Sequence, residues 1–365
     1  MANNTARLGD LATYINGYAF KPADWGDTGL PIIRIQDLTG NSYQLNRYDG
    51  EYSERIEVND GDVLISWSAS LGVYVWHRGK ALLNQHIFKV VFDKLPVNKD
   101  YFVFAVEHKL AEMESKTHGA TMKHIVKKDF DGTTIPYPPI EKQAEIADHL
   151  RHITSLIDRQ TEQLLLLDQL VKSRFIELFG DPIMNQRGWR AMALEDNATL
   201  LNGKAYKQDE LLDSGKYPVL RVGNFFSNRG WYYSNLELSE DKYCDNGDLL
   251  YAWSASFGPQ IWNGGKAIYH YHIWKVLVGK AYNKQFLCNL LEYTTESLMN
   301  DTHGIAMMHL TKSGMEKNKF IVPPMELQEQ FAAFVEQTDK SKLAVQKGLQ
   351  ELEILKKSLM QQYFG

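Results

Sequence analysis

The residues best suited to contact a charged ligand lie in two short segments of similar composition. The stretch KTHGATMKHIVKK, residues 116–128, holds four lysines and two histidines without a carboxylate, and its counterpart at 302–319 differs in including Glu316. Cations beside threonine and glycine suit a loop that approaches phosphate groups or base edges, although a solvated basic face is the alternative. The candidate contacts are Thr117, His118, Lys123, His124 and Lys127, followed by Thr302, His303, His309 and Lys312.

Further polar candidates flank two identical WSAS segments, at 67–70 and 253–256. We expect both tryptophans in the core, whereas the serines are either polar readers at a strand end or capping groups in a turn. Lysines near these segments are candidate phosphate contacts, and one arginine in each half either pairs with guanine or anchors a strand. These candidates are Ser68, Ser70, Ser254, Ser256, Lys80, Lys89, Lys266, Lys275, Arg34 and Arg221.

No arrangement typical of a catalytic or metal site is found in the sequence. The double prolines of YPPI (137–140) and VPPM (322–325) lack the asparagine and aromatic residue of an adenine-methylating loop, so we interpret them as helix-entry stops. No phosphate-binding G-x-x-x-x-G-K-[ST] loop occurs. His270 and His272 are expected to share one face of a strand, but no third metal ligand is evident. We therefore predict no catalytic residue, no metal and no cofactor in this chain.

These candidates recur because the chain is an internal duplication. LGDLATYINGYAFK at Leu8 matches LEDNATLLNGKAYK at Leu194, and NDGDVLISWSASLG at Asn59 matches DNGDLLYAWSASFG at Asp245, both at an offset of 186 residues. The correspondence continues through GKALLNQHIFKV and GKAIYHYHIWKV, and it ends with Phe-Gly at 179–180 and 364–365. We conclude that two copies of one domain follow each other.

Each copy changes character once. Short β-branched and aromatic runs separated by turn formers predict strands and hairpins, at 32–35, 63–67, 73–76 and 87–92 in the first copy, followed by a helix near 101–114. After each double proline comes a long stretch without proline that is rich in helix formers. The fold class is therefore α+β. The predicted divisions are a domain at 1–140, a helix at 141–179, a linker at 180–189, a second domain at 190–325 and a second helix at 326–365.

The two helices carry apolar residues at the alternating spacing of three and four that is typical of a coiled coil. Each helix of about 40 residues would be about 60 Å long. Such narrow stripes are best buried by one partner helix, and we expect each copy to supply the partner for the other in an antiparallel pair. The predicted pairing residues are Leu150, Ile153, Ile157, Leu164, Leu167, Val171, Val335, Leu349, Leu352 and Leu359.

Bulk composition sets limits on location but not on function. Hydrophobic residues make up 44% and charged residues 23%, as in a globular protein, and no apolar run approaches the length of a membrane span. The start of the chain lacks the pattern of a secretory signal, and its only cysteines, Cys244 and Cys288, are spaced unlike a zinc site. We expect a cytoplasmic protein. The net charge of −5 neither indicates nor excludes nucleic-acid binding.

Taken in order, the motifs resemble those of the specificity subunits of type I restriction–modification systems. The resemblance covers nearly the whole chain and rests on IPYPPIEKQ and IVPPMELQ before the helices, the Asn-Gly openings at 16–17 and 202–203, the Gly-Asp strands at 61–62 and 247–248, and FGDP at 179–182. It implies two target recognition domains that each read half of a bipartite DNA site, with paired helices between them. It also implies docking of two methyltransferase subunits, which use S-adenosylmethionine, and of restriction subunits, which use ATP and magnesium.

One feature departs from that family, whose two recognition domains commonly differ. Here the copies match across strands and loops, which predicts related half-sites and a nearly palindromic target. A helical spacer of about 60 Å would span at most about 17 base pairs. Two alternatives remain open, namely a chain with its own methyltransferase activity and a stand-alone bivalent DNA-binding scaffold.

Overall fold

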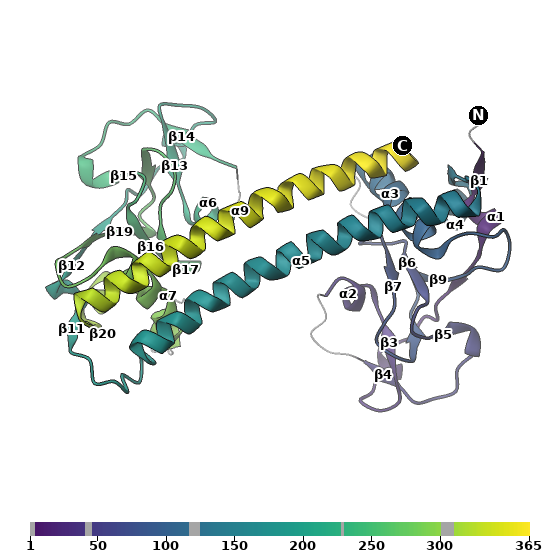
Figure 1. The fold of residues 1–365 in the computed structure, drawn as a ribbon, viewed down its shortest axis with the longest axis horizontal. Helices are drawn as coiled ribbons and strands as arrows, with labels where there is room; N and C mark the ends of the chain where they lie inside the picture. Colours follow the sequence, from purple (N-terminus) through teal and green to yellow (C-terminus); the bar gives the residue numbers. More distant parts are fainter. Residues whose placement is uncertain (1–3, 41–45, 117–124, 228–229, 301–309) are drawn as a thin grey trace. The chain divides into compact units, whose positions relative to one another are not determined.

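The computed structural model describes residues 4–40, 46–116, 125–227, 230–300 and 310–365 (Figure 1). The chain divides into two compact units: unit 1 comprises residues 1–162 and 346–365, and unit 2 comprises residues 163–345. Each unit contains the β-rich part of one copy of the repeat together with parts of both long helices. Helices α5 (Ile140–Phe179) and α9 (Met325–Phe364) therefore each begin in one unit and end in the other.

Unit 1 contains two four-stranded sheets and a two-stranded ribbon. The first sheet has the order β2-β9-β6-β7 and is antiparallel, the second has the order β4-β3-β8-β5 with a parallel β3–β8 pair, and the ribbon pairs β1 with β10. The strands are β1 (Thr5–Arg7), β2 (Thr13–Asn16), β3 (Leu30–Ile33), β4 (Arg47–Tyr48), β5 (Glu57–Val58), β6 (Val63–Ser66), β7 (Gly72–Val75), β8 (Ala81–Leu83), β9 (Ile87–Val91) and β10 (Thr134–Pro136). The helices are α1 (Leu8–Leu11), α2 (Ile35–Leu38), α3 (Lys99–Lys116) and α4 (Lys127–Gly132).

Unit 2 repeats this topology. Its sheets have the orders β12-β19-β16-β17 and β14-β13-β18-β15, with a parallel β13–β18 pair, and β11 pairs with β20. The strands are β11 (Ala191–Ala193), β12 (Ala198–Asn202), β13 (Tyr217–Leu220), β14 (Tyr232–Ser234), β15 (Tyr243–Cys244), β16 (Leu249–Ser254), β17 (Ser256–Ile261), β18 (Ala267–Tyr269), β19 (Ile273–Val278) and β20 (Lys319–Ile321). The helices are α6 (Val222–Phe226), α7 (Lys284–Asn300) and α8 (Lys312–Lys317).

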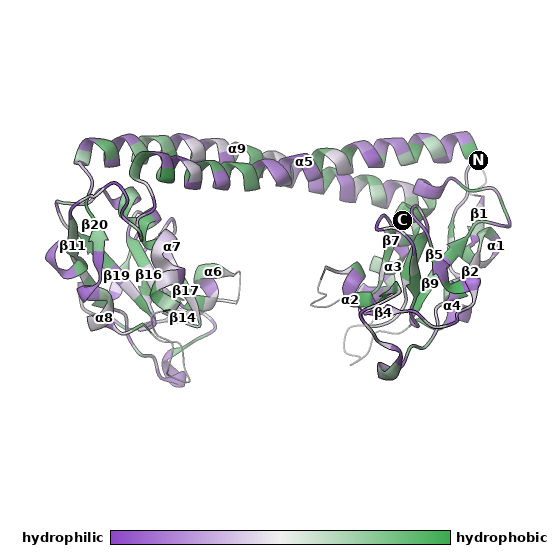
Figure 2. Cartoon of the chain, turned by 90° about the horizontal axis from the view of Figure 1, so that it is seen from below, coloured by the Kyte–Doolittle hydropathy of each residue, from purple (hydrophilic) through white to green (hydrophobic). Residues whose placement is uncertain are grey.

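The first sheet of each unit has two buried faces, because its side chains alternate between two cores. In β6, Val63 and Ile65 join the core under α3, whereas Leu64 joins the core of the second sheet. In β16, Leu249 and Tyr251 face the core with α7, and Leu250 packs on the other side. Continuous apolar strands are the expected pattern for a sheet covered on both faces. Figure 2 shows these strands as largely hydrophobic, whereas α5 and α9 alternate between hydrophilic and hydrophobic turns.

The Gly-Asp motifs before β6 and β16 form equivalent turns. Gly61 and Gly247 adopt φ values of +88° and +87°, which glycine tolerates best. The carboxylate of Asp62 accepts a hydrogen bond from the backbone N–H of Asn59 (2.9 Å), and Asp248 accepts one from Asp245 (2.8 Å). A lysine at the first position of α3 or α7 also donates to the glycine carbonyl. The Gly-Asp motif therefore has a structural role, because both of its residues are needed to form this turn.

The glutamine of each PPxxxQ motif is a buried anchor at the helix start. Gln143 is 1% exposed and Gln328 is 0% exposed. The Oε1 atom of Gln143 accepts from the backbone N–H of Asn98 (2.9 Å), and its Nε2 donates to the carbonyl of Pro138 (2.9 Å). Gln328 repeats both bonds, with Asn283 (2.8 Å) and Pro323 (2.8 Å). The glutamine thereby fixes the helix to the residues that precede α3 or α7.

Each long helix packs in both units, and in each unit the two helices contribute to one core. In unit 1, Leu150 of α5 and Phe364 of α9 belong to the same hydrophobic cluster. In unit 2, the ring of Phe331 in α9 lies 5.4 Å from that of Phe175 in α5. Because the start of each helix meets the end of the other, the two segments are antiparallel within each unit. Segment 180–189 forms a turn after α5, and the Trp189 Nε1–H donates to the carbonyl of Phe179 (2.8 Å).

The predicted α+β class with two long helices is confirmed, with two local differences. The predicted strand at 32–35 ends at Ile33, because Asp37 accepts a hydrogen bond from the Arg34 N–H (2.8 Å) and starts α2 there. The expectation that His270 and His272 lie in a strand is wrong: they lie in the connection between β18 and β19.

Candidate nucleic-acid interface

The two WSAS segments form tight hairpin turns at the ends of β6 and β16. Ala69 and Ala255 adopt φ values of 60° and 67°, a left-handed conformation that costs a residue with a Cβ about 1–2 kcal/mol. In the first copy, the hydroxyl of Ser66 donates to the carbonyl of Ser70 and holds the turn closed. The same strained conformation thus occurs at the same position of both copies. Strained backbone of this kind clusters at active sites and ligand-binding turns.

The predicted serines differ in their accessibility at these turns. Ser70 and Ser256 are exposed, Ser68 is half-buried, and Ser254 is 5% exposed. Ser70 and Ser256 can therefore meet a ligand, whereas Ser254 is placed as a group within the turn. Of the two interpretations that the sequence left open, a polar reader therefore fits Ser70 and Ser256, and a structural group in the turn fits Ser254.

A cluster of aromatic rings lies directly beside each turn, and we call it the strand-end cluster. It consists of Trp67, His86 and Phe88 in unit 1 and of Trp253, His272 and Trp274 in unit 2. In unit 1, the Trp67 ring stacks on Phe88 at 5.4 Å and meets His86 edge-on at 4.9 Å. The same arrangement recurs in unit 2, at 5.6 Å and 5.0 Å.

A backbone hydrogen bond joins the turn to the connection before β9 or β19. The Trp67 N–H donates to the carbonyl of His86 (3.2 Å), and the Trp253 N–H donates to the carbonyl of His272 (3.0 Å). Both tryptophans are half-buried rather than fully in the core as expected. The two histidines were not among the predicted DNA contacts, although the recurrence of a histidine at the same position of QHIFKV and YHIWKV was a signal that could have found them.

The Asn-Gly openings end at the same place. A Cβ atom on Gly17 would lie 2.0 Å from the carbonyl oxygen of Asn84, and one on Gly203 would lie 2.3 Å from that of Tyr269. Only glycine allows the chain to pass so close to this connection. The openings therefore bring the end of β2 or β12 to the strand-end cluster.

The basic segments return to the same edge of each domain. The N–H of Ile125 donates to the carbonyl of Trp67 (3.0 Å), and in unit 2 a pocket of about 430 Å³ has Trp253, His272, Thr311 and Lys312 in its wall. The predicted residues Thr117, His118, Lys123, His124, Thr302, His303 and His309 lie outside the described residues. The described ends of both segments nevertheless lie beside the cluster.

The two candidate lysines of these segments that lie in the described ranges, Lys127 and Lys312, are placed at this edge. The Nζ atom of Lys127 is 5.6 Å from the centroid of the Tyr14 ring and also pairs with Asp131 (2.7 Å). Lys312 pairs with Glu316 (3.5 Å) while it lines the pocket. The first pair lies within helix α4 and the second within helix α8, and both are partly exposed. Exposed ion pairs of this kind hold a lysine only weakly.

The other predicted lysines have internal partners. Lys80 pairs with Glu57 (2.9 Å), which raises the pKa of the lysine, and Lys266 lies 3.7 Å from Glu240. Lys89 is half-buried and donates to the carbonyl of Glu57. These contacts leave Lys80 and Lys266 accessible at the surface, whereas Lys89 is committed to the fold.

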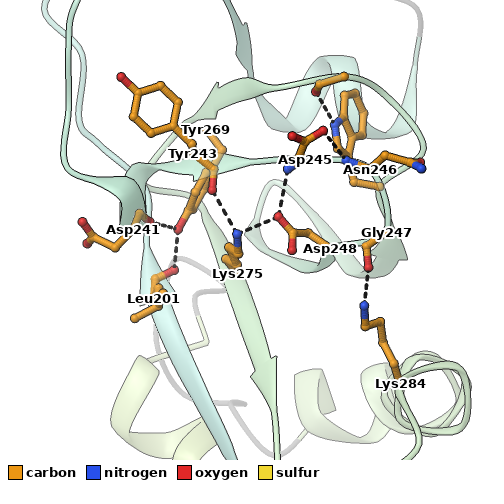
Figure 3. A network of polar contacts seen from close by, with 12 residues as sticks. Leu201, Asp241, Tyr243, Asp245, Asn246, Gly247, Asp248, Tyr269, Lys275 and Lys284 are labelled. Atoms are coloured by element: carbon orange, nitrogen blue, oxygen red, sulfur yellow. Dashed lines mark hydrogen bonds and ion pairs between the residues drawn. The ribbon is translucent and has the colours of Figure 1, made fainter.

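Lys275 is the counterpart of Lys89 and shows the structural role most clearly. Figure 3 shows its Nζ atom between the Asp248 carboxylate (2.6 Å) and the carbonyl of Tyr243 (3.2 Å). Its side chain is 17% exposed. In the same view the Tyr269 hydroxyl donates to the carbonyl of Asp241 (2.6 Å). The lysine thus ties the Gly-Asp turn to the second sheet, which favours a structural role over a phosphate contact.

The two candidate arginines anchor the helices that follow them. Arg34 precedes α2, its side chain is 17% exposed and its guanidinium lies 5.6 Å from the Trp25 ring. Arg221 precedes α6, and its guanidinium stacks 4.2 Å from the centroid of Tyr232. Of the two interpretations that the sequence left open, these contacts favour the anchor over guanine recognition.

Burial in unit 2 keeps His270 and the two cysteines neutral. Burial, reinforced by the nearby His272 and Arg221, lowers the pKa of His270 to about 4. The rings of His270 and His272 lie 4.8 Å apart. Burial also raises the pKa of Cys244 and Cys288 to about 12. Within the described ranges, no three potential ligands gather as a metal site would require.

The predicted helix-pairing residues are all at least half-buried. Leu150, Ile153, Val171 and Val335 are buried, and Ile157, Leu164, Leu167, Leu349, Leu352 and Leu359 are half-buried. Neighbouring apolar residues that the spacing excluded, such as Leu165 and Leu166, are exposed. Among the helices of the described residues, none is both long and apolar enough to cross a bilayer.

The chain belongs to the family of type I restriction modification DNA specificity domains, whose model matches residues 3–167 and 186–354. It thus contains two such domains. Its relatives are specificity subunits of type I restriction enzymes, and the prediction of a non-catalytic specificity subunit is confirmed by this membership. The MjaVIII subunit of Methanocaldococcus jannaschii is 24% identical, with 97% of this chain and 90% of that subunit aligned. The EcoBI subunit of Escherichia coli is 29% identical over 45% of this chain and only 35% of its own length.

Solved structures support the fold. The S subunit of a type I restriction–modification system from M. genitalium aligns with a TM-score of 0.59, at 15% identity, over 99% of this chain and 96% of that one. A chain from a structure on complex assembly and conformational transition of the type I system aligns with a TM-score of 0.54, at 14% identity, over 99% of this chain and 97% of that one.

Proposed function

We propose that this specificity subunit binds a bipartite double-stranded DNA target, with each recognition domain reading one half-site. The observation that carries this proposal is the recurrence of the strand-end cluster, which the fold assembles in each unit from the same four sequence motifs. Each cluster lies beside a strained hairpin turn with an exposed serine and a lysine. Polar and aromatic side chains held on strand ends are suited to base edges, and neighbouring lysines are suited to phosphates.

The target is nearly palindromic, because the two clusters contain the same residue types at most positions. Tryptophan, histidine and the WSAS turn are shared, and Phe88 corresponds to Trp274. Similar readers in similar frames select similar bases. The net charge of −5 is no obstacle, since phosphate contacts depend on local charge.

The chain also recruits two adenine methyltransferase subunits, and through them restriction subunits. Leu170 of α5 and Leu355 of α9 occupy equivalent helix positions and are 48% and 46% exposed. Leucines that are exposed at equivalent positions in the two units offer the same apolar contact twice, once to each copy of one partner. S-adenosylmethionine then belongs to the methyltransferase, and ATP and magnesium belong to the restriction subunit. The assembly works in the cytoplasm, where the DNA is accessible.

The recruitment is tested by co-expression with a methyltransferase subunit of a type I system from the same host, followed by size-exclusion chromatography with light scattering. We expect two methyltransferase subunits per chain. The variants Leu170→Glu and Leu355→Glu should each release one, and the double variant should release both. The matched control is Leu343→Glu, because Leu343 is 68% exposed but corresponds to Asp158 in the other copy. Equal losses with the control would contradict this docking surface.

The DNA target is tested by sequencing methylated adenines in a host that carries the assembly. Two short related half-sites around a constant gap are expected. Two unrelated half-sites would refute the palindromic part, and a single uninterrupted site would refute the bipartite part. A self-contained methyltransferase would instead bind S-adenosylmethionine in calorimetry with the isolated chain. A stand-alone scaffold would bind DNA without retaining any methyltransferase subunit.

A further inference from the structure

We propose that Gln85 and Tyr271 are specificity-determining residues, and that the two half-sites differ at the base pair which they contact. This inference rests on the proposed function, and it names the residue at which the two recognition domains differ in the base that they select. The residues are equivalent, since Gln85 stands in QHIFKV and Tyr271 in YHIWKV at an offset of 186. Each lies in the connection that leads to the strand-end cluster, directly before the shared histidine.

Both side chains are presented to solvent. Gln85 is exposed, and Tyr271 is 37% exposed although it is aromatic. In unit 2 the Tyr271 ring lies 3.9 Å from the centroid of His272 and 5.9 Å from that of Trp253, so the cluster supports it from below. An exposed aromatic ring that is supported by other packed rings is suited to contact the flat face or the edge of a nucleobase.

The backbone that carries each residue is held on both sides. The N–H of Gln85 donates to the carbonyl of Tyr18 (2.9 Å), and the following residue, His86, accepts from Trp67. The N–H of Tyr271 donates to the carbonyl of Lys204 (3.0 Å), and its carbonyl accepts from the Trp253 Nε1–H (2.8 Å). Because the backbone is already fixed, little entropy is lost when Gln85 or Tyr271 binds DNA. The contacts that each side chain makes with a base can therefore contribute fully to the difference in affinity between bases.

The two residue types make different contacts with bases. A glutamine amide can donate to N7 and accept from the N6 amino group of adenine, which selects adenine in the major groove. Tyrosine lacks that paired donor and acceptor, and it offers one hydroxyl and an apolar ring. Because the neighbouring tryptophan, histidine and WSAS residues are shared by both copies, the exchange changes the reader while its frame stays the same. We therefore expect adenine at this position in the half-site of the first copy and a different base in the other.

The test exchanges the residues between the copies. The assembly of this chain with its methyltransferase subunits is prepared as wild type, Gln85→Tyr and Tyr271→Gln, and the bound motif is read by selection from a randomised DNA library. Each variant should change the preference at one base pair of one half-site by about tenfold, towards the base of the other half-site. Each new residue already occupies the equivalent frame in the other copy, so both variants should fold, as circular dichroism and melting will check.

The matched control is Tyr52→Gln, because Tyr52 is also 37% exposed and lies outside the connection. It should leave the motif unchanged. The proposal is overturned if both exchanges leave the wild-type motif intact, if they lower affinity equally for all sequences, or if they alter both half-sites together. Failure of the proposed function is a distinct result, in which the wild-type assembly itself selects no bipartite motif.

Discussion

The ring of Phe364, at the end of α9, lies 5.2 Å from the ring of Tyr101 in α3 and completes the core of unit 1. The equivalent pair in unit 2 consists of Phe179 and Phe286, whose centroids are 4.7 Å apart. Each long helix therefore closes the core of the unit in which it ends. The helices are thus integral to both recognition units as well as being a connection between them.

Truncating these rings should destabilise the unit that they close. Phe364→Ala and Phe179→Ala each remove a fully buried ring, and we expect each to lower the free energy of unfolding by about 3–5 kcal/mol. Denaturant unfolding monitored by tryptophan fluorescence measures this loss. The control Ile354→Ala, at a residue 70% exposed, should change it by less than about 0.5 kcal/mol. A loss below about 1 kcal/mol for either phenylalanine would contradict its role in the core.

The buried glutamine at the start of each helix should be essential for stability. Gln328→Leu leaves the N–H of Asn283 and the carbonyls of Ala281 and Pro323 without their partner, and each unmet group costs about 1–3 kcal/mol. We expect at least about 2 kcal/mol of lost stability in thermal unfolding. Gln337→Leu, on the exposed part of the same helix, is the control and should be nearly neutral. Equal effects of the two substitutions would contradict the role of Gln328 as a buried, hydrogen-bonded anchor.

The fragment consisting of residues 163–345 should fold alone. Unit 2 is one continuous segment, and its core includes Val171 and Phe175 of α5 together with Phe331 and Val335 of α9. We expect a cooperative thermal transition by circular dichroism. A shorter fragment of residues 186–345 lacks the α5 contribution and should be markedly less stable. Identical melting of the two fragments, or no cooperative transition in the longer one, would argue against the independence of unit 2.

His270 should make unit 2 less stable in mild acid. Its pKa of about 4 in the folded protein lies below the ordinary value of 6.5, so the unfolded state binds the proton more readily between these values. Stability is therefore retained above pH 6.5 and falls as the pH drops towards 4, by at most about 1.4 kcal/mol per pH unit. Histidine NMR signals during a pH titration measure the pKa, and His270→Asn should remove this part of the slope. A His270 signal that titrates near 6.5 would contradict the expected burial effect.

Much of the architecture was readable from the sequence because the duplication repeats it. Periodicity located the helices and the main strands, and the spacing of residues such as Leu150 and Val171 selected the side of each helix that is buried over its exposed neighbours. Local patterns of this kind survive in the fold because a buried strand or helix face must be apolar. The match between copies also separated the WSAS and Asn-Gly motifs from background.

Only the tertiary structure decided what the individual polar residues do. A lysine in sequence is a candidate for a phosphate contact, yet Lys275 is held by Asp248 and the carbonyl of Tyr243, and Arg221 stacks on Tyr232. Conversely, Tyr271 gained significance because the fold leaves it exposed beside Trp253 and His272. The reason is physical: the partners of a polar side chain are set by strand register and by sheet-to-sheet packing, which bring together residues far apart in the chain. The sequence determined two copies of one domain and two long helices, and packing determined which side chains remain available to a ligand.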